Sequence, residues 1–252
     1  MTTAGIHSKT PPASDAFILP DAPLSQDEKM TNARHLSETG QHHHLAQYLG
    51  NPETTIVSSE RYVVTQRTSS MAGSHYPDLL VVFDADPAAY EARNGYIIEE
   101  QGKPPDFVME VASRSTRHVD TGAKRVAYAR QGIPEYWRFD ETGEYHGTKL
   151  AGDRLVNGRY ETIDIEELSD GSLQGYTAVL GLFLRWTRGR LGWHDPATGE
   201  HIATFDSERE RANAELSARI QAEARANAAE TRANNAEARA RYLEAEVRRL
   251  RP

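Results

Sequence analysis

The sequence predicts an α/β fold with a β extension and a long C-terminal helix, and three observations support this prediction. The stretch 103–140 reads as strand, loop, helix, turn and strand, because its side chains first alternate and then recur every four residues. Short strand-like segments, separated by turns that contain glycine, follow between residues 144 and 194. From residue 207 the chain has no glycine and is dominated by alanine, arginine and glutamate, which favours one long helix.

The composition limits the class of protein. The chain of 252 residues is 38% hydrophobic and 26% charged, enough for one sizeable core with appendages. It has no cysteine, which excludes disulfides and thiolate catalysis and fits a reducing interior. We see neither an apolar run of membrane-spanning length nor a secretory leader, so we expect a soluble, cytoplasmic protein. We expect three parts: a disordered arm over 1–30, a folded domain over 31–205 and a helical tail over 206–252.

The formal net charge of −8 is unevenly distributed. Residues 207–252 hold 10 of the 29 basic residues and 8 of the 37 acidic ones, which leaves a balance of −10 for the rest of the chain. Proteins that bind nucleic acids usually carry a basic surface. The acidic body therefore argues against a role on DNA.

The N-terminal 30 residues are polar and show no sustained period, which predicts the disordered arm. A helix is expected over 32–49, where Gly50-Asn51-Pro52 ends it. Three consecutive histidines, 42–44, point about 100° apart on a helix, so they are not expected to chelate one ion. Glu38 on this helix could serve a site as an extra acid or lie in solvent.

Two strands are expected before residue 100. The segment 54–66 reads as a strand that is interrupted at 58–60, and Glu60 in this interruption is a candidate auxiliary acid. The second strand, 76–84, opens with Pro77-Asp78 and continues with apolar, partly β-branched residues. A polar insertion over 84–102 separates it from the next strand.

Alternation over 106–112 predicts a strand with two different faces. One face carries Asp106, Val108, Glu110 and Ala112, and the other carries Phe107, Met109 and Val111. A carboxylate in the middle of an apolar strand loses its hydration, so a cation or hydrogen-bond donors must compensate. Glu110 is therefore either paired with an arginine or, together with Asp78, part of a cation site.

A helix follows this strand. Hydroxyl residues over 113–116 can cap its start, and Gly132 with Pro134 predicts its end. Asp120, Lys124 and Tyr128 are four residues apart and therefore share one face of the helix. The next residues, EYWRF over 135–139, are typical of a strand.

These motifs resemble the restriction-endonuclease-like Uma-two family of the PD-(D/E)XK nuclease superfamily. The resemblance covers roughly residues 34–205 and is strongest in PPDFVMEVASRST, in the spacing of Asp120, Lys124 and Tyr128, and in GIPEYWRFD. It implies a mixed central sheet flanked by helices and an endonuclease that hydrolyses DNA with Mg²⁺ or Mn²⁺.

The resemblance also implies the residues of the site. Asp78 and Glu110 match the metal ligands, with the carbonyl of Val111 as a third ligand. The superfamily's lysine two residues after the glutamate is missing, since Ala112 holds that place, and Lys124 on the helix matches the position that replaces it. The remaining candidates are auxiliary: Asp106, Glu60 and Tyr128.

The segments after residue 140 are expected to form a β extension without a catalytic constellation. Strands are expected over 144–150, 154–159, 160–165 and 189–194, with turns at Gly152-Asp153, Asn157-Gly158 and Asp170-Gly171. An apolar alternating segment covers 180–186. Trp186 and Trp193 are expected in the core.

The helical tail repeats every seven residues. Glutamate recurs at 223, 230, 237 and 244, and an apolar position recurs at 222, 229, 236, 243 and 250, with a second at 226, 233, 240 and 247. This is a coiled-coil pattern whose contact positions are mostly alanine. The tail is expected either to be a solvated single helix or to join copies of the chain. We expect a homo-oligomer, such as a dimer, that forms through the core and the C-terminal helix.

Two functions from different classes remain open. The first is a metal-dependent DNA endonuclease with a lysine displaced to the helix. The second is a weak or inactive nuclease-like protein that assembles with partners through its C-terminal helix. The acidic body and the missing strand lysine favour the second function.

Overall fold

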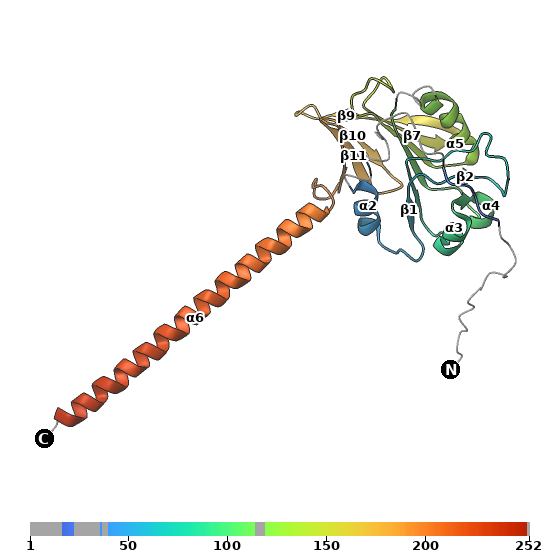
Figure 1. Ribbon diagram of the computed structural model, residues 1–252. Coiled ribbons are helices and arrows are strands. Elements are labelled where there is room, and N and C mark those ends of the chain that lie inside the picture. The colour runs from blue at the N-terminus through green and yellow to red at the C-terminus, as the bar shows by residue number, and fades with distance from the viewer. Residues whose placement is uncertain (1–16, 23–35, 37–39, 114–118, 251–252) are drawn as a thin grey trace, which may run out of the picture. The chain divides into compact units, whose positions relative to one another are not determined.

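The computed structural model describes residues 17–22, 36, 40–113 and 119–250 (Figure 1). The chain divides into two compact units, Met1–Ile202 and Ala203–Pro252. Glu38, the capping segment 114–116 and most of the N-terminal arm lie outside the described residues. Among the helices that are described, none combines the length and the hydrophobicity of a membrane span.

A six-stranded mixed sheet forms the centre of the first unit, which confirms the predicted fold class. The strands β5 and β6 run parallel, and every other neighbouring pair runs antiparallel. In spatial order the strands are β1 (Ile56–Ser58), β3 (Leu79–Val82), β5 (Phe107–Val111), β6 (Glu135–Phe139), β7 (Leu150–Val156) and β8 (Arg159–Ile163).

A helical crossover between β5 and β6 explains their parallel pairing, because parallel neighbours cannot be joined by a tight turn. The crossover consists of a π-helical segment, η1 (Val119–Lys124), which continues into α5 (Arg125–Gln131). Gly132 ends α5 with a φ of 83°, a left-handed conformation that glycine adopts without steric cost. The predicted order of strand, helix and strand, and the predicted end of the helix, are confirmed.

The two faces of the central sheet contribute to different apolar clusters, as the alternation along β5 predicts. Phe107, Met109 and Val111 pack against the second sheet, whereas Val108 packs with Tyr128 of α5. The second sheet is antiparallel and contains β12 (Arg190–His194), β11 (Leu182–Thr187), β10 (Leu173–Thr177) and β9 (Glu166–Glu167). Trp186 and Trp193 are buried, as expected.

Part of the predicted β extension belongs to the central sheet. The expected strands 154–159 and 160–165 fall on the β7–β8 hairpin, which turns at Asn157-Gly158. The turn predicted at Gly152-Asp153 is wrong, since both residues pair with β8 within β7. Both turn residues have positive φ, 49° and 78°, as this type of hairpin turn requires. The second sheet is then the true extension, and it covers the face of the central sheet opposite to α5.

Smaller elements complete the first unit. The helix α2 (Gln41–Leu49) ends at Gly50, as predicted, and the amide of Gln41 donates to the Leu191 carbonyl at 3.1 Å. The strand β2 (Val63–Val64) pairs with β4 (Tyr96–Ile97), and the backbone turns at Glu60 with a φ of 55°. The insertion 84–102 therefore has structure of its own: α3 (Pro87–Arg93), β4 and α4 (Ile98–Gln101).

Residues 17–22 pack on the first unit, so the prediction of a disordered arm over 1–30 is wrong for this segment. Leu19 is buried, and its backbone N–H donates to the carbonyl of Arg93 at 2.9 Å. The other buried members of its cluster are Tyr62, Val64 and Ile97. The surrounding sequence is polar and has no period, so its pattern gave no sign of this anchor.

The second unit is dominated by α6 (Phe205–Leu250), a helix of 46 residues. A long helix was predicted here from the loss of glycine and the abundance of alanine, and the structure confirms it. In the described part of α6, arginines and glutamates three or four residues apart form ion pairs. All of these pairs are exposed, so each contributes little to the stability of the helix.

Candidate active site

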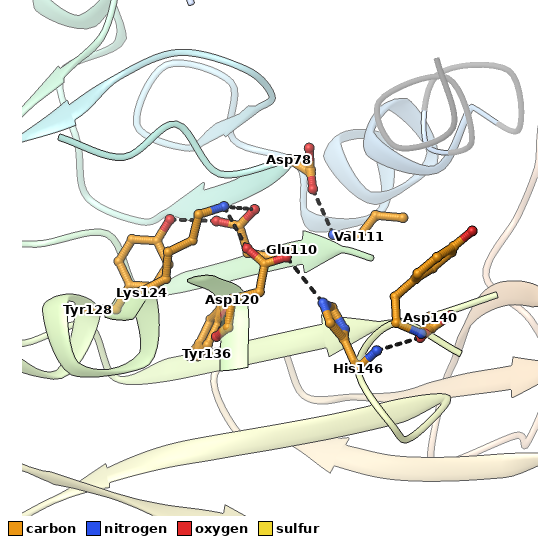
Figure 2. Close-up of polar contacts among 10 residues, drawn as sticks. Asp78, Glu110, Val111, Asp120, Lys124, Tyr128, Tyr136, Asp140 and His146 are labelled. Carbon is orange, nitrogen blue, oxygen red and sulfur yellow. Dashed lines mark hydrogen bonds and ion pairs between the residues drawn. The ribbon is translucent and has the colours of Figure 1, made fainter. Parts of the chain in front are cut away.

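Asp78 and Glu110 face each other across two strands of the central sheet. The antiparallel strands β3 and β5 pair Leu79 with Met109, and the same register one residue further places Asp78 opposite Glu110. A hydrogen bond fixes this end of the strand pair, since the Val111 N–H donates to Asp78 Oδ2 at 2.7 Å (Figure 2). Asp78 and Glu110 are therefore neighbours on the face that α5 covers.

Glu110 is 2% exposed and has two partners on the crossover helix. Lys124 Nζ lies 2.8 Å from Glu110 Oε2, and the Tyr128 hydroxyl donates to Oε1 at 2.6 Å. The compensating cation of this mid-strand carboxylate is thus a lysine and not the arginine that the sequence left open. Tyr128, for which no role could be derived from sequence, holds the carboxylate in place.

Lys124 joins two buried carboxylates. Its ammonium lies 2.8 Å from Glu110 and 2.8 Å from Asp120 Oδ1, one turn earlier on η1 (Figure 2). A π-helical turn is wider than an α-helical one and is frequent at functional sites. The predicted common face of Asp120, Lys124 and Tyr128 is confirmed, and all three are linked, directly or through Lys124, to Glu110.

His146 extends the cluster from a loop. Its Nε2 lies 3.2 Å from Asp120 Oδ2, and its side chain is 1% exposed. The Asp140 carboxylate folds this loop by accepting backbone N–H groups at 2.8–3.1 Å. Those groups belong to Thr142, Gly143, Tyr145 and His146. The strand predicted over 144–150 is therefore wrong before Leu150, and sequence spacing could not place His146 beside a residue 26 positions earlier.

The pKa values of the acids and the lysine in this cluster are shifted from their ordinary values. Burial and the neighbouring Glu110 carboxylate raise the pKa of Asp78 well above its ordinary range. Burial also raises the pKa of Glu110, although Lys124 opposes this shift. Burial alone would lower the pKa of Lys124, but the carboxylates of Glu110 and Asp120 raise it overall. Lys124 is therefore charged at neutral pH. Its single positive charge is smaller than the negative charge that Asp78, Glu110 and Asp120 would carry if all three were ionised.

Two other predicted auxiliary acids have different surroundings. Asp106 lies just before β5, where it pairs with Lys103 Nζ at 2.7 Å and accepts from the Phe83 N–H at 2.8 Å. Glu60 has an exposed side chain, and its backbone N–H donates to the Pro77 carbonyl at 3.1 Å. The backbone of Glu60 is thus bonded to the residue before Asp78, but its side chain is exposed. Asp106 belongs to a separate ion pair with Lys103.

The donor atoms suit a small divalent cation. In the described part of the chain, no three His, Cys, Asp or Glu side chains are grouped so that they could enclose a metal ion. Two facing carboxylates remain, those of Asp78 and Glu110. Mg²⁺ is commonly held by one or two carboxylates, with waters and substrate phosphate oxygens as its other ligands. The pair Asp78 and Glu110 fits that kind of ion and not a fully enclosed structural metal.

A family model and a solved structure show similarity to this chain. The model of a family described as "Uma2: Putative restriction endonuclease" matches residues 28–185. One similar solved structure is that of "a putative nuclease belonging to DUF820" from Anabaena variabilis ATCC 29413. It is 13% identical, with a TM-score of 0.37, over 54% of this chain and 69% of that chain. A search of curated proteins found no match.

Proposed function

This chain belongs to the family described as "Uma2: Putative restriction endonuclease", and we propose that it is a metal-dependent endonuclease that hydrolyses phosphodiester bonds in DNA. The observation that carries the proposal is the triad of Asp78, Glu110 and Lys124. Two carboxylates face each other across a strand pair, and a lysine ammonium lies 2.8 Å from one of them. A structural ion pair between Lys124 and Glu110 would not need Asp78, whose pKa is raised by burial and by Glu110.

In this proposal Asp78 and Glu110 hold Mg²⁺ or Mn²⁺, and the Val111 carbonyl is a further oxygen ligand. When bound, such an ion polarises the phosphate and lowers the pKa of a coordinated water. The Val111 N–H orients Asp78 through Oδ2 and leaves its other oxygen for the ion. The Tyr128 hydroxyl orients Glu110 through Oε1, whereas Lys124 lies at Oε2, so an ion at Glu110 would share this carboxylate with the lysine.

Lys124 replaces the lysine that is absent from the strand. Ala112, two residues after Glu110, is 7% exposed and brings no charge to this place. The Lys124 ammonium, held by Glu110 and Asp120, can position the attacking water and offset charge that develops on the phosphate. Asp120 is held in turn by His146 at 3.2 Å, so these two residues position the lysine without contacting the substrate.

Nicking of supercoiled plasmid tests the proposal. The wild-type protein should nick DNA with Mg²⁺ or Mn²⁺ and lose this activity in EDTA, and Glu110→Gln should be inactive under all conditions. Asp106→Asn is the matched control, because Asp106 is an acid next to the same strand that pairs with Lys103 instead. It should keep nicking activity. Metal-independent nicking, or an active Glu110→Gln, would refute the proposal.

The affinity for Mn²⁺ should rise with pH. A carboxyl whose pKa is raised keeps its proton to higher pH than usual, and this proton must leave before Asp78 can bind a cation. Titration calorimetry between ~pH 6 and ~pH 8 should therefore show tighter binding at the higher pH, with proton release. Asp78→Asn should bind Mn²⁺ weakly at every pH. Equal affinities of the two proteins would show that the site does not include Asp78.

A nuclease-like protein without activity is the second candidate function. It is favoured by the balance of −10 outside residues 207–252, since an acidic surface repels the phosphate backbone. In that case the protein should neither nick plasmid DNA nor bind Mn²⁺ at Asp78, while its fold remains intact. The nicking and calorimetry experiments thus distinguish the two candidates.

A further inference from the structure

A stripe of mostly alanine side chains runs along α6, with glutamates along one side of it and arginines along most of the other. The stripe, here called the α6 seam, alternates steps of four and three residues, which keeps it on one side of a supercoiled helix. It consists of Ala222, Ala226, Ala229, Ala233, Ala236, Ala240, Leu243 and Val247. Its two large side chains are not covered within the described chain, since Leu243 is 52% and Val247 56% exposed.

Every seam heptad has glutamate on one flank, and three successive heptads have arginine on the other. In heptad terms, Ala226, Ala233, Ala240 and Val247 occupy a, and Ala222, Ala229, Ala236 and Leu243 occupy d. The e positions are then Glu223, Glu230, Glu237 and Glu244. The g positions are Arg225, Arg232 and Arg239, followed by Glu246. In a coiled coil, residues at the e and g positions contact the partner helix beside the seam.

Only some of these charged residues form ion pairs within the described part of α6. Arg219 pairs with Glu223 at 3.0 Å, and Glu237 pairs with Arg241 at 3.4 Å, both on one helix. Within the described structure, neither Arg225 nor Arg239 forms an ion pair with a carboxylate of α6. A single helix gains some stability from oppositely charged residues three or four apart, but it gains none from having one sign on each flank of a seam.

We propose that α6 binds α6 of a second copy of the chain as a parallel, in-register, two-stranded coiled coil. In a parallel pair, each g residue faces the e residue of the following heptad on the partner. Arg225 would then face Glu230 of the second copy, and the two following arginines would face Glu237 and Glu244. In an antiparallel pair, g faces g and e faces e, which would place arginine against arginine and glutamate against glutamate.

The flanking charges are expected to decide the pairing because the seam itself is weak. An alanine side chain buries little apolar area, so the contact surface is small for a helix roughly 70 Å long. Small side chains allow the two helices to approach closely, which also brings the flanking charges within reach of each other. Leu243 and Val247 add larger apolar contacts near the C-terminal end.

Cysteine cross-linking of the full chain tests both the pairing and its direction, since the natural sequence has no cysteine. Ala222→Cys lies at one end of the seam and should form a disulfide-linked dimer on oxidation. In an antiparallel pair the two copies of residue 222 would be roughly 40 Å apart and could not cross-link. Ala224→Cys, on the outer face of the helix, is the matched control and should remain monomeric on a non-reducing gel.

Charge reversal in the Ala222→Cys background tests the arginine–glutamate pairing. Replacing Arg225, Arg232 and Arg239 by Glu should abolish the cross-link, and replacing Glu230, Glu237 and Glu244 by Arg should do the same. A mixture of the two variants should recover a cross-linked heterodimer, because each flank again meets the opposite sign. Equal cross-linking at 222 and 224, no cross-linking at 222, or unchanged cross-linking in either charge-reversed variant would overturn the proposal.

Discussion

Lys124→Met is expected to reduce the rate of plasmid nicking on the order of 10²- to 10³-fold, the loss typical when one preorganised charge-stabilising group is removed from an active site. Methionine keeps the length of the side chain but removes the ammonium that lies 2.8 Å from both Glu110 and Asp120. Affinity for Mn²⁺ should be kept or increased, because the cation no longer competes with the lysine for Glu110.

The same change should also lower stability, by about 3–5 kcal/mol, since it leaves two buried carboxylates without their cation. Nicking must therefore be measured at a temperature at which circular dichroism shows a folded protein. Arg154→Met is the matched control, because Arg154 is 3.0 Å from the buried Glu135 in an ion pair outside the cluster. It should lose stability but not nicking activity.

A second variant makes the interpretation specific. If the strand position can still accept a lysine, Ala112→Lys combined with Lys124→Met should recover part of the activity, since residue 112 points to the same side of β5 as Glu110. Wild-type activity in Lys124→Met alone would exclude a catalytic role of this lysine. Lys124 would then be only the counter-charge of Glu110.

Asp78→Asn is expected to abolish nicking and at the same time to raise the melting temperature of the metal-free protein at neutral pH. Burial and Glu110 raise the pKa of Asp78, so the folded state binds this proton more tightly than the unfolded state does. The free energy of unfolding therefore falls as pH rises above the unfolded pKa of about 3.9. It falls by about 1.4 kcal/mol per pH unit until the pH reaches the folded pKa.

Asparagine cannot ionise, but its oxygen can still accept the 2.7 Å hydrogen bond from the Val111 N–H. Asp140→Asn is an instructive control because its shift has the opposite sign. Burial alone would raise the pKa of Asp140, but hydrogen bonds from four backbone N–H groups lower it overall. The ionised form of Asp140 therefore stabilises the fold. Thermal melts of both variants without metal should thus move in opposite directions. A lower melting temperature for Asp78→Asn would contradict the repulsion between Asp78 and Glu110.

The residues of the candidate site that sequence could indicate are those with a local pattern. Glu110 was conspicuous because a carboxylate interrupts an apolar strand, and Lys124 because it repeats with Asp120 and Tyr128 at helical spacing. The structure brings these residues together as one cluster, in which Asp78 is placed by the register of β3 and β5. Their roles in catalysis stay predictions that the variants above would test.

Features that depend on distant contacts were missed for a physical reason. His146 reaches Asp120 only because Asp140 folds the loop between β6 and β7, and a residue pattern over 144–150 resembles a strand equally well. Leu19 is anchored by residues more than 40 positions away in the chain. The β7–β8 hairpin was recognised from Asn157-Gly158, but hairpin signals do not specify which sheet the strands join.

The lysine between Glu110 and Asp120 also bears on whether the protein would need the proposed ion in order to fold. In small zinc domains the free energy of metal binding drives folding, so the apoprotein stays unfolded. Here the chain carries its own positive charge into the site on Lys124. The central sheet and α5 can therefore assemble without an ion, and under the proposed function loss of the ion would abolish activity without unfolding the domain.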